Sequence, residues 1–265
     1  MDHRFSVRQW AAWAPGLTTR EDWLAWFAQP SRIAGDATPP LPDMPAMMRR
    51  RIEKLGRVAL QSAYDALDGA SDDIRAACPA VFASRYGDMR RSMELMKQLA
   101  AEGAVSPTAF SVSVHNAFAA LFSIARGDRS SYSAVASGPE SAEHAFVEAV
   151  GLLVEGAPEV LVVYYEEPLP APLEHFSAPN EFLRGWACRI APAPGRGGIA
   201  FALSAAPHEA DTPESDLPAD LELLRFLTDG NATSHERTVA GRRWRCARVD
   251  AARDGGDPTL QRGWL

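Results

Sequence analysis

Two polar segments in the middle of the chain carry residue types that can do nucleophilic or acid–base chemistry. The first surrounds Ser137, which follows a short apolar stretch and precedes Gly138, Pro139 and Glu140. This order predicts a strand-to-helix turn, where a side chain is exposed and the helix N-terminus stabilises negative charge. Ser137 lacks the flanking glycines of a nucleophile elbow, and Ser137 to Glu140 match a capping box. The sequence therefore favours a helix-capping hydroxyl over a nucleophile.

The second segment contains His115 and Asn116 at the start of a predicted helix. A histidine can act as a general base, and an asparagine amide can stabilise an oxyanion. No partner nucleophile is visible nearby, so a histidine satisfied by neighbouring backbone is favoured. An acyl transferase or thioesterase that uses Ser137 together with His115 stays open as an alternative function.

The sequence contains no motif typical of a metal site or of a phosphate-binding loop. The six histidines are dispersed, and the three cysteines, Cys78, Cys188 and Cys246, are far apart with no C-x-x-C pair. A glycine-rich stretch at 195–198 lacks the Gly-Lys-Ser/Thr of a phosphate loop. It is instead expected to turn a hairpin between strands at 184–190 and 199–203. We expect no metal and no cofactor.

Composition narrows the class of protein further. The chain has 265 residues, 46% of them hydrophobic, and its formal net charge is −7. This apolar content supports a substantial core, whereas the acidic balance argues against a nucleic-acid binder. The apolar runs are too short to span a membrane, and no signal peptide is recognisable at the N-terminus. We predict a cytoplasmic protein with reduced thiols.

The turn at Ser137 must be positioned by the elements around it. A strand at 131–136, a helix to about residue 155 and a strand at 159–165 predict a βαβ unit. Upstream, Thr19 to Asp22 predict a capped helix that carries tryptophans into an apolar cover. Further elements are expected throughout the chain: a strand at 80–85, helices at 46–68, 89–102, 114–126 and 217–228, a strand at 242–249 and a tail after residue 250.

These segments together resemble the N-terminal half of a β-ketoacyl synthase. The matching stretches cover roughly residues 4–168 and are 49–60, 81–85, 106–116, 123–127, 131–140 and 159–163. The similarity is greatest to the short ketosynthase-like chain length factors of bacterial aryl polyene and related type II systems. The resemblance implies an α/β, thiolase-like fold with a mixed sheet covered by helices and a truncated C-terminal part. We expect a ketosynthase-like domain at 1–168 and a short extension at 169–265, with two to three strands and one helix packing on the same domain.

The resemblance also bears on catalysis. Ketosynthases place a nucleophilic cysteine at the position that corresponds here to Ala136, Ser137, Gly138 and Pro139, which we call the elbow. A serine is a far weaker nucleophile than a thiolate there. The second-half histidines of the family are not matched by the motifs around the late histidines, which are His175, His208 and His235. The implied protein does not condense acyl groups by itself.

The family further implies two partners. A chain length factor pairs as a heterodimer with a full-length ketosynthase in fatty acid, aryl polyene or polyketide biosynthesis. The residues expected at that interface are Phe110, Val112, Val114, Phe118, Tyr132 and Val135. An acidic acyl carrier protein is expected to contact the basic flank of helix 46–68 at Arg49, Arg50 and Arg57. A solvated helix face is the simpler interpretation of that flank, and a pure carrier-binding module is a second alternative function.

Overall fold

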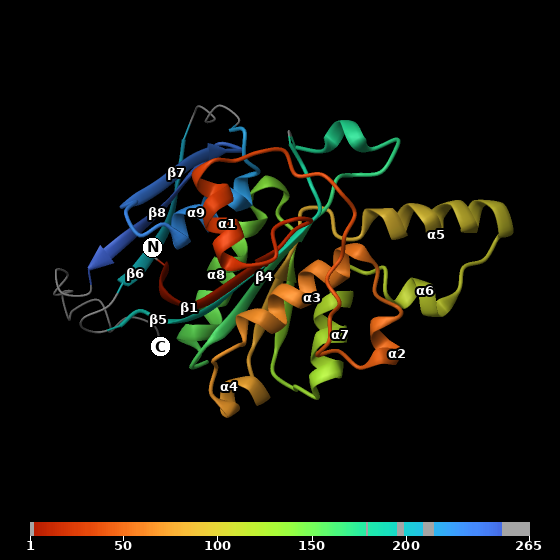
Figure 1. Ribbon diagram of the computed structural model, residues 1–265, viewed down its shortest axis with the longest axis horizontal. Helices are drawn as coiled ribbons and strands as arrows, with labels where there is room; N and C mark the ends of the chain where they lie inside the picture. Colours follow the sequence, from red (N-terminus) through yellow and green to blue (C-terminus); the bar gives the residue numbers. More distant parts are fainter. Residues whose placement is uncertain (1–2, 179, 195–198, 209–214, 251–265) are drawn as a thin grey trace.

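Figure 1 shows the computed structural model, which describes residues 3–178, 180–194, 199–208 and 215–250. The predicted turn at 195–198 and the predicted tail after residue 250 lie outside these residues. None of the described helices has the length and the hydropathy of a membrane-spanning segment.

One eight-stranded mixed sheet runs through the molecule in the order β3-β2-β4-β5-β1-β6-β8-β7. Strand β2 is parallel to both β3 and β4, and the pairings from β4 onward to β7 are antiparallel. The strand bounds are β1 His3–Trp13, β2 Ala80–Ala83, β3 Tyr132–Val135, β4 Val160–Glu166, β5 Arg184–Pro192, β6 Ile199–Pro207, β7 Ser234–Val239 and β8 Arg242–Asp250. The α/β fold class and its mixed, helix-covered sheet are confirmed.

Helices cover both faces of the central strands, which explains why β4 is buried along its whole length. Helices α3 (Lys54–Ala66) and α7 (Ala117–Arg126) form one apolar core with the sheet. Helices α1 (Arg20–Ala28), α8 (Ser141–Val154) and α9 (Ala219–Thr228) form the other core on the opposite face. Helix α1 begins with the predicted capping box of Thr19 and Asp22, and it buries Trp23 and Trp26 as expected.

The remaining helices lie at the periphery of the sheet. They are α2 (Ala46–Arg49), α4 (Asp72–Ala76), α5 (Met89–Glu102) and α6 (Pro107–Ser111), with short 3-10 turns η1 (Gly138–Glu140) and η2 (Glu174–Phe176). Helix α5 projects away from the sheet in Figure 1, and it has no buried residue. We call α5 and α6 together the arm.

The predicted hairpin of strands 184–190 and 199–203 is wrong. The N-terminal strand β1 lies between β5 and β6, so these two strands do not pair with each other. The aromatic ring of Phe5 explains this insertion, since it stacks on Phe146 of α8 at 5.0 Å and on Phe201 of β6 at 5.7 Å. A central strand that packs aromatic residues into a buried core is favoured over an exposed edge.

Two further expectations need correction. The predicted helix at 46–68 is split into α2 and α3, and the Arg57 guanidinium donates to the Arg49, Ile52 and Pro39 carbonyls around that break. The segment after residue 168 contributes four described strands, β5 to β8, rather than two or three. These strands belong to the same sheet as β1 to β4. The division into a domain at 1–168 and an extension at 169–265 stays a prediction.

Candidate functional site

The elbow lies where β3 ends at one edge of the sheet. Residues Gly138–Glu140 form the 3-10 turn η1, and α8 starts only at Ser141. The predicted cap is wrong, because the Ser137 hydroxyl makes no capping hydrogen bond. Ser141 stabilises the turn instead: its Oγ accepts a hydrogen bond from the Ser137 N–H at 2.9 Å and donates one to the Gly138 carbonyl at 2.7 Å.

The β7–β8 pair, which we call the C-terminal hairpin, binds the elbow from the other side. Arg237 of β7 donates to both carboxylate oxygens of Glu143 on α8, at 2.5 and 3.0 Å, and to the Pro139 carbonyl. Trp244 of β8 donates through Nε1 to Glu140 at 2.7 Å. The residue expected to complete a capping box is therefore engaged by a tryptophan that lies more than 100 positions later in the sequence.

His115 is fixed next to the elbow by backbone contacts. Its Nε2 lies 3.2 Å from the Val135 carbonyl, and its own carbonyl accepts a hydrogen bond from the Tyr165 hydroxyl at 3.1 Å. A Cβ on Gly87 would lie 2.7 Å from His115 Nδ1, so only glycine leaves room for this ring. Asn116 precedes α7 without a side-chain cap, and no hydrogen bond joins His115 to Ser137 in the described chain.

None of the three thiols is at the elbow. Cys78, Cys188 and Cys246 are all buried and unpaired. Burial raises the pKa of each of these thiols to about 12. They are therefore protonated at neutral pH and lack the thiolate that a covalent acyl intermediate needs.

A cluster of buried charges lies beneath the elbow. Arg184 of β5 donates to Asp220 of α9 through Nε and Nη2 at 2.9 and 2.6 Å, and the Trp186 indole donates to the same carboxylate. Glu166, the last residue of β4, accepts the Arg85 backbone N–H at 2.7 Å. Burial raises the pKa of Glu166 to about 8. Arg184, Asp220 and Glu166 line a cavity of about 50 Å³ together with Pro139 of the elbow and Ala142 of α8.

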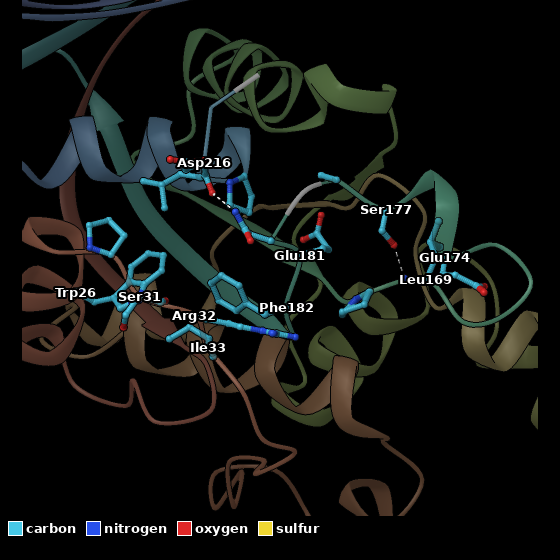
Figure 2. Close-up of a pocket in the computed structure, with 16 residues that line it drawn as sticks. Trp26, Ser31, Arg32, Ile33, Leu169, Glu174, Ser177, Glu181, Phe182 and Asp216 are labelled. Carbon is cyan, nitrogen blue, oxygen red and sulfur yellow. Dashed lines mark hydrogen bonds between the residues drawn. The ribbon is translucent and has the colours of Figure 1, made fainter. Parts of the chain in front are cut away.

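A second cavity of about 570 Å³ lies beside this cluster, and the two share Ala178, Glu181 and Pro218 in their walls. Figure 2 shows Trp26 and Phe182 on one side of it and Leu169 and Ser177 on the other, with Arg32 reaching between them. The side-chain polar atoms of its walls are partly engaged: Trp26 donates to the Ser31 carbonyl, and Ser177 accepts the Leu169 N–H. Sequence reasoning missed this cavity because four separate segments supply its walls and none carries a recognisable motif.

The residues expected at a partner interface divide into three groups according to their exposure to solvent. Phe110, Val114 and Tyr132 are large apolar side chains exposed to solvent, and Phe110 is 58% exposed. Val112 and Val135 are half-buried. Phe118 is only 5% exposed, since its ring packs edge-on against Tyr165 at 5.2 Å, so it belongs to the core rather than to a partner surface.

The basic residues expected at a carrier protein divide into two groups, according to whether the guanidinium is engaged within the chain. Arg49 donates to the Leu41 carbonyl, and Arg57 holds the break between α2 and α3. Both guanidiniums are therefore engaged within the chain. Arg50 is exposed and has no hydrogen-bond or ion-pair partner among the described residues, so it is the member of the trio that is free to meet a ligand.

Comparison with known proteins agrees with this geometry. The family of β-ketoacyl synthase N-terminal domains matches residues 23–246. The fold is similar to a chain of the ketosynthase ApeO in complex with its chain length factor ApeC from Xenorhabdus doucetiae, with 23% identity and a TM-score of 0.76 over 92% of this chain and 99% of that one. These coverages mean that the two chains have nearly the same length. A search among curated proteins returns no match.

Two more structures are similar over less of their length. The ishigamide ketosynthase/chain length factor matches at 18% identity with a TM-score of 0.61, over 77% of this chain and 67% of that one. The type II ketosynthase AntDE, in complex with the acyl carrier protein AntF, matches at 14% identity with a TM-score of 0.57, over 72% of this chain and 64% of that one. At these identities the structures establish the thiolase-like fold of ketosynthases, which confirms the expected fold.

Proposed function

Because the chain belongs to the family of β-ketoacyl synthase N-terminal domains, we propose that it is a non-condensing partner subunit that pairs with an active, full-length ketosynthase. The observation that carries this proposal is a set of exposed apolar side chains on the arm, on the segment that follows it and on the edge strand β3. We call this set the partner surface, and it consists of Met96, Leu99, Phe110, Val114 and Tyr132.

The partner surface offers apolar area for association. Its five side chains are among the large apolar residues that the described chain leaves exposed, and exposed apolar patches mark sites of association. Strand β3 also ends the sheet, so one side of its backbone has no strand neighbour among the described strands. An open edge of this kind is a template for pairing with another chain. The bond from His115 to the Val135 carbonyl ties the segment between α6 and α7, which carries Val114, to the end of β3.

The elbow supports the non-condensing part of the proposal. Ser137 has neither a base nor a capping contact in the described chain, and the three thiols are buried and protonated. A hydroxyl without an activating base is a poor nucleophile at neutral pH. The chemistry of carbon–carbon bond formation would therefore come from the partner, and this subunit would help to shape the chamber that holds the growing chain. Fatty acid, aryl polyene and polyketide synthesis are the pathways in which such a pair would act, with an acyl carrier protein delivering the substrate.

Co-expression with a full-length ketosynthase from the same genome tests the pairing. We expect one peak of a 1:1 heterodimer in size-exclusion chromatography with light scattering. Phe110→Asp combined with Tyr132→Asp should abolish this peak, because charges would be buried in an apolar interface. Val154→Asp is the matched control. Val154 is 82% exposed and is the last residue of α8, at the end of that helix away from the elbow. The proposal fails if the wild-type chain elutes alone, or if the control variant disrupts the complex as strongly as the double variant.

A further inference from the structure

Three arginines without carboxylate partners meet at a groove far along the sheet from β3. The groove measures about 270 Å³, and Arg8, Arg20 and Arg248 are among its lining residues, which include no acidic side chain. By contrast, two buried arginines on β5 have carboxylate partners: Arg184 pairs with Asp220, and Arg189 pairs with Glu159. We propose that this groove binds an organic phosphate, a phosphate ester with an apolar body.

The backbone of β1 creates the groove. The register of β1 against β5 shifts between Val7 and Gln9, so Arg8 is the extra residue of a β-bulge. Bulges re-aim side chains and occur next to binding sites. Strand β1 pairs with β6 only over His3–Phe5, so the residues of β1 after Phe5 have no pairing partner on β6 in the described chain. Arg20 of α1 reaches this freed edge and donates to the Trp10 carbonyl at 2.8 Å and to Gln9 at 2.7 Å.

The guanidiniums have donor capacity left for a ligand. Arg8 has no hydrogen-bond or ion-pair partner among the described residues. Arg248 donates through Nη2 to the Asp229 carbonyl, but its Nε is buried and makes no hydrogen bond in the described chain. Arg20 and Arg248 lie over the rings of Trp10 and Phe201 at 4.9 and 5.3 Å, which holds both cations in place. Positioned guanidiniums suit the oxygens of a phosphate, because each can donate two parallel hydrogen bonds.

The rest of the lining indicates an apolar body on the ligand. Ile199 is 57% exposed at the start of β6, and Val7 and Trp10 are half-buried beside it. An apolar group bound there would remove these surfaces from water, while its phosphate meets the arginines. Inorganic phosphate would contact only the arginines and would bury none of this apolar surface. Phenyl phosphate should therefore bind more tightly than inorganic phosphate.

Isothermal titration calorimetry of the full chain with phenyl phosphate and with inorganic phosphate tests this site without any protein partner. We expect saturable binding of phenyl phosphate, with a weaker Kd for inorganic phosphate. Arg8→Gln should raise the Kd about tenfold, the effect of removing one charge-assisted contact. The control Arg245→Gln, at an exposed arginine of β8 paired with Glu236, should leave the Kd within about twofold. Absence of saturable binding at low-millimolar phenyl phosphate, or equal loss in both variants, would overturn the proposal.

Discussion

The contact between Arg237 and Glu143 fastens the C-terminal hairpin to the elbow, and its removal should be costly. Glu143 is only 2% exposed, and both of its oxygens accept hydrogen bonds from Arg237. Arg237→Leu would leave this carboxylate buried without a partner, which costs about 3–5 kcal/mol. The double variant Arg237→Leu, Glu143→Leu removes both charges and should lie within about 2 kcal/mol of the wild type, because an apolar pair can replace a buried ion pair.

Urea unfolding followed by circular dichroism measures this difference as a change in the free energy of unfolding. Arg245→Leu is a surface control, because its ion pair with Glu236 is exposed and should contribute less than about 1 kcal/mol. Equal losses in the single and double variants would refute the argument, since the loss would then come from packing rather than from a buried charge.

Three further outcomes follow from the site. Burial raises the pKa of Glu166 from an ordinary value of 4.5 to about 8, so its contribution to stability is full below pH 4.5 and is lost as the pH rises through 8. Glu166→Gln should flatten that fall in unfolding free energy, and an unchanged slope in urea titrations across this window would contradict it. Arg50→Glu should weaken binding to an acyl carrier protein at low salt without changing the melting temperature, whereas Arg57→Glu should lower the melting temperature because Arg57 ties α3 to three carbonyls. Mass spectrometry after incubation with an acyl thioester should show Ser137 unmodified; an acylated Ser137 would instead favour the alternative of an acyl transferase or thioesterase.

The parts of the fold that local patterns determine could be predicted from the sequence. The capping box of Thr19 and Asp22, the helix at Met89–Glu102 and the strand–turn–helix–strand order around the elbow depend on residues close together in the chain. Their signals are the spacing of apolar residues and the chemistry of turns. The family resemblance added the assignment of these elements to one sheet.

Long-range pairing could not be predicted in the same way. Strands β5 and β6 are neighbours in the sequence, and only the packing of Phe5 against Phe146 and Phe201 explains why β1 separates them. Strand β7 was missed because its residues 234–239 are mostly polar, with Arg237 directed at a helix carboxylate rather than at solvent. The capping prediction failed for a related reason: Glu140 bonds to Trp244, a partner distant in the sequence.

Contacts between residues far apart in the sequence also show what the segment after residue 168 contributes to the fold. Among the described strands, β1 pairs with β5 and β6 alone, so the first strand depends on the segment after residue 168 for its place in the sheet. Helix α9 from the same segment supplies Asp220 to the buried Arg184 and packs Phe226 against Phe201. The C-terminal hairpin then binds Glu140 and Glu143 at the elbow. The late segment therefore supplies four of the eight described strands, one helical cover of the sheet and the support of the elbow, whereas β3 ends the described sheet on the opposite side.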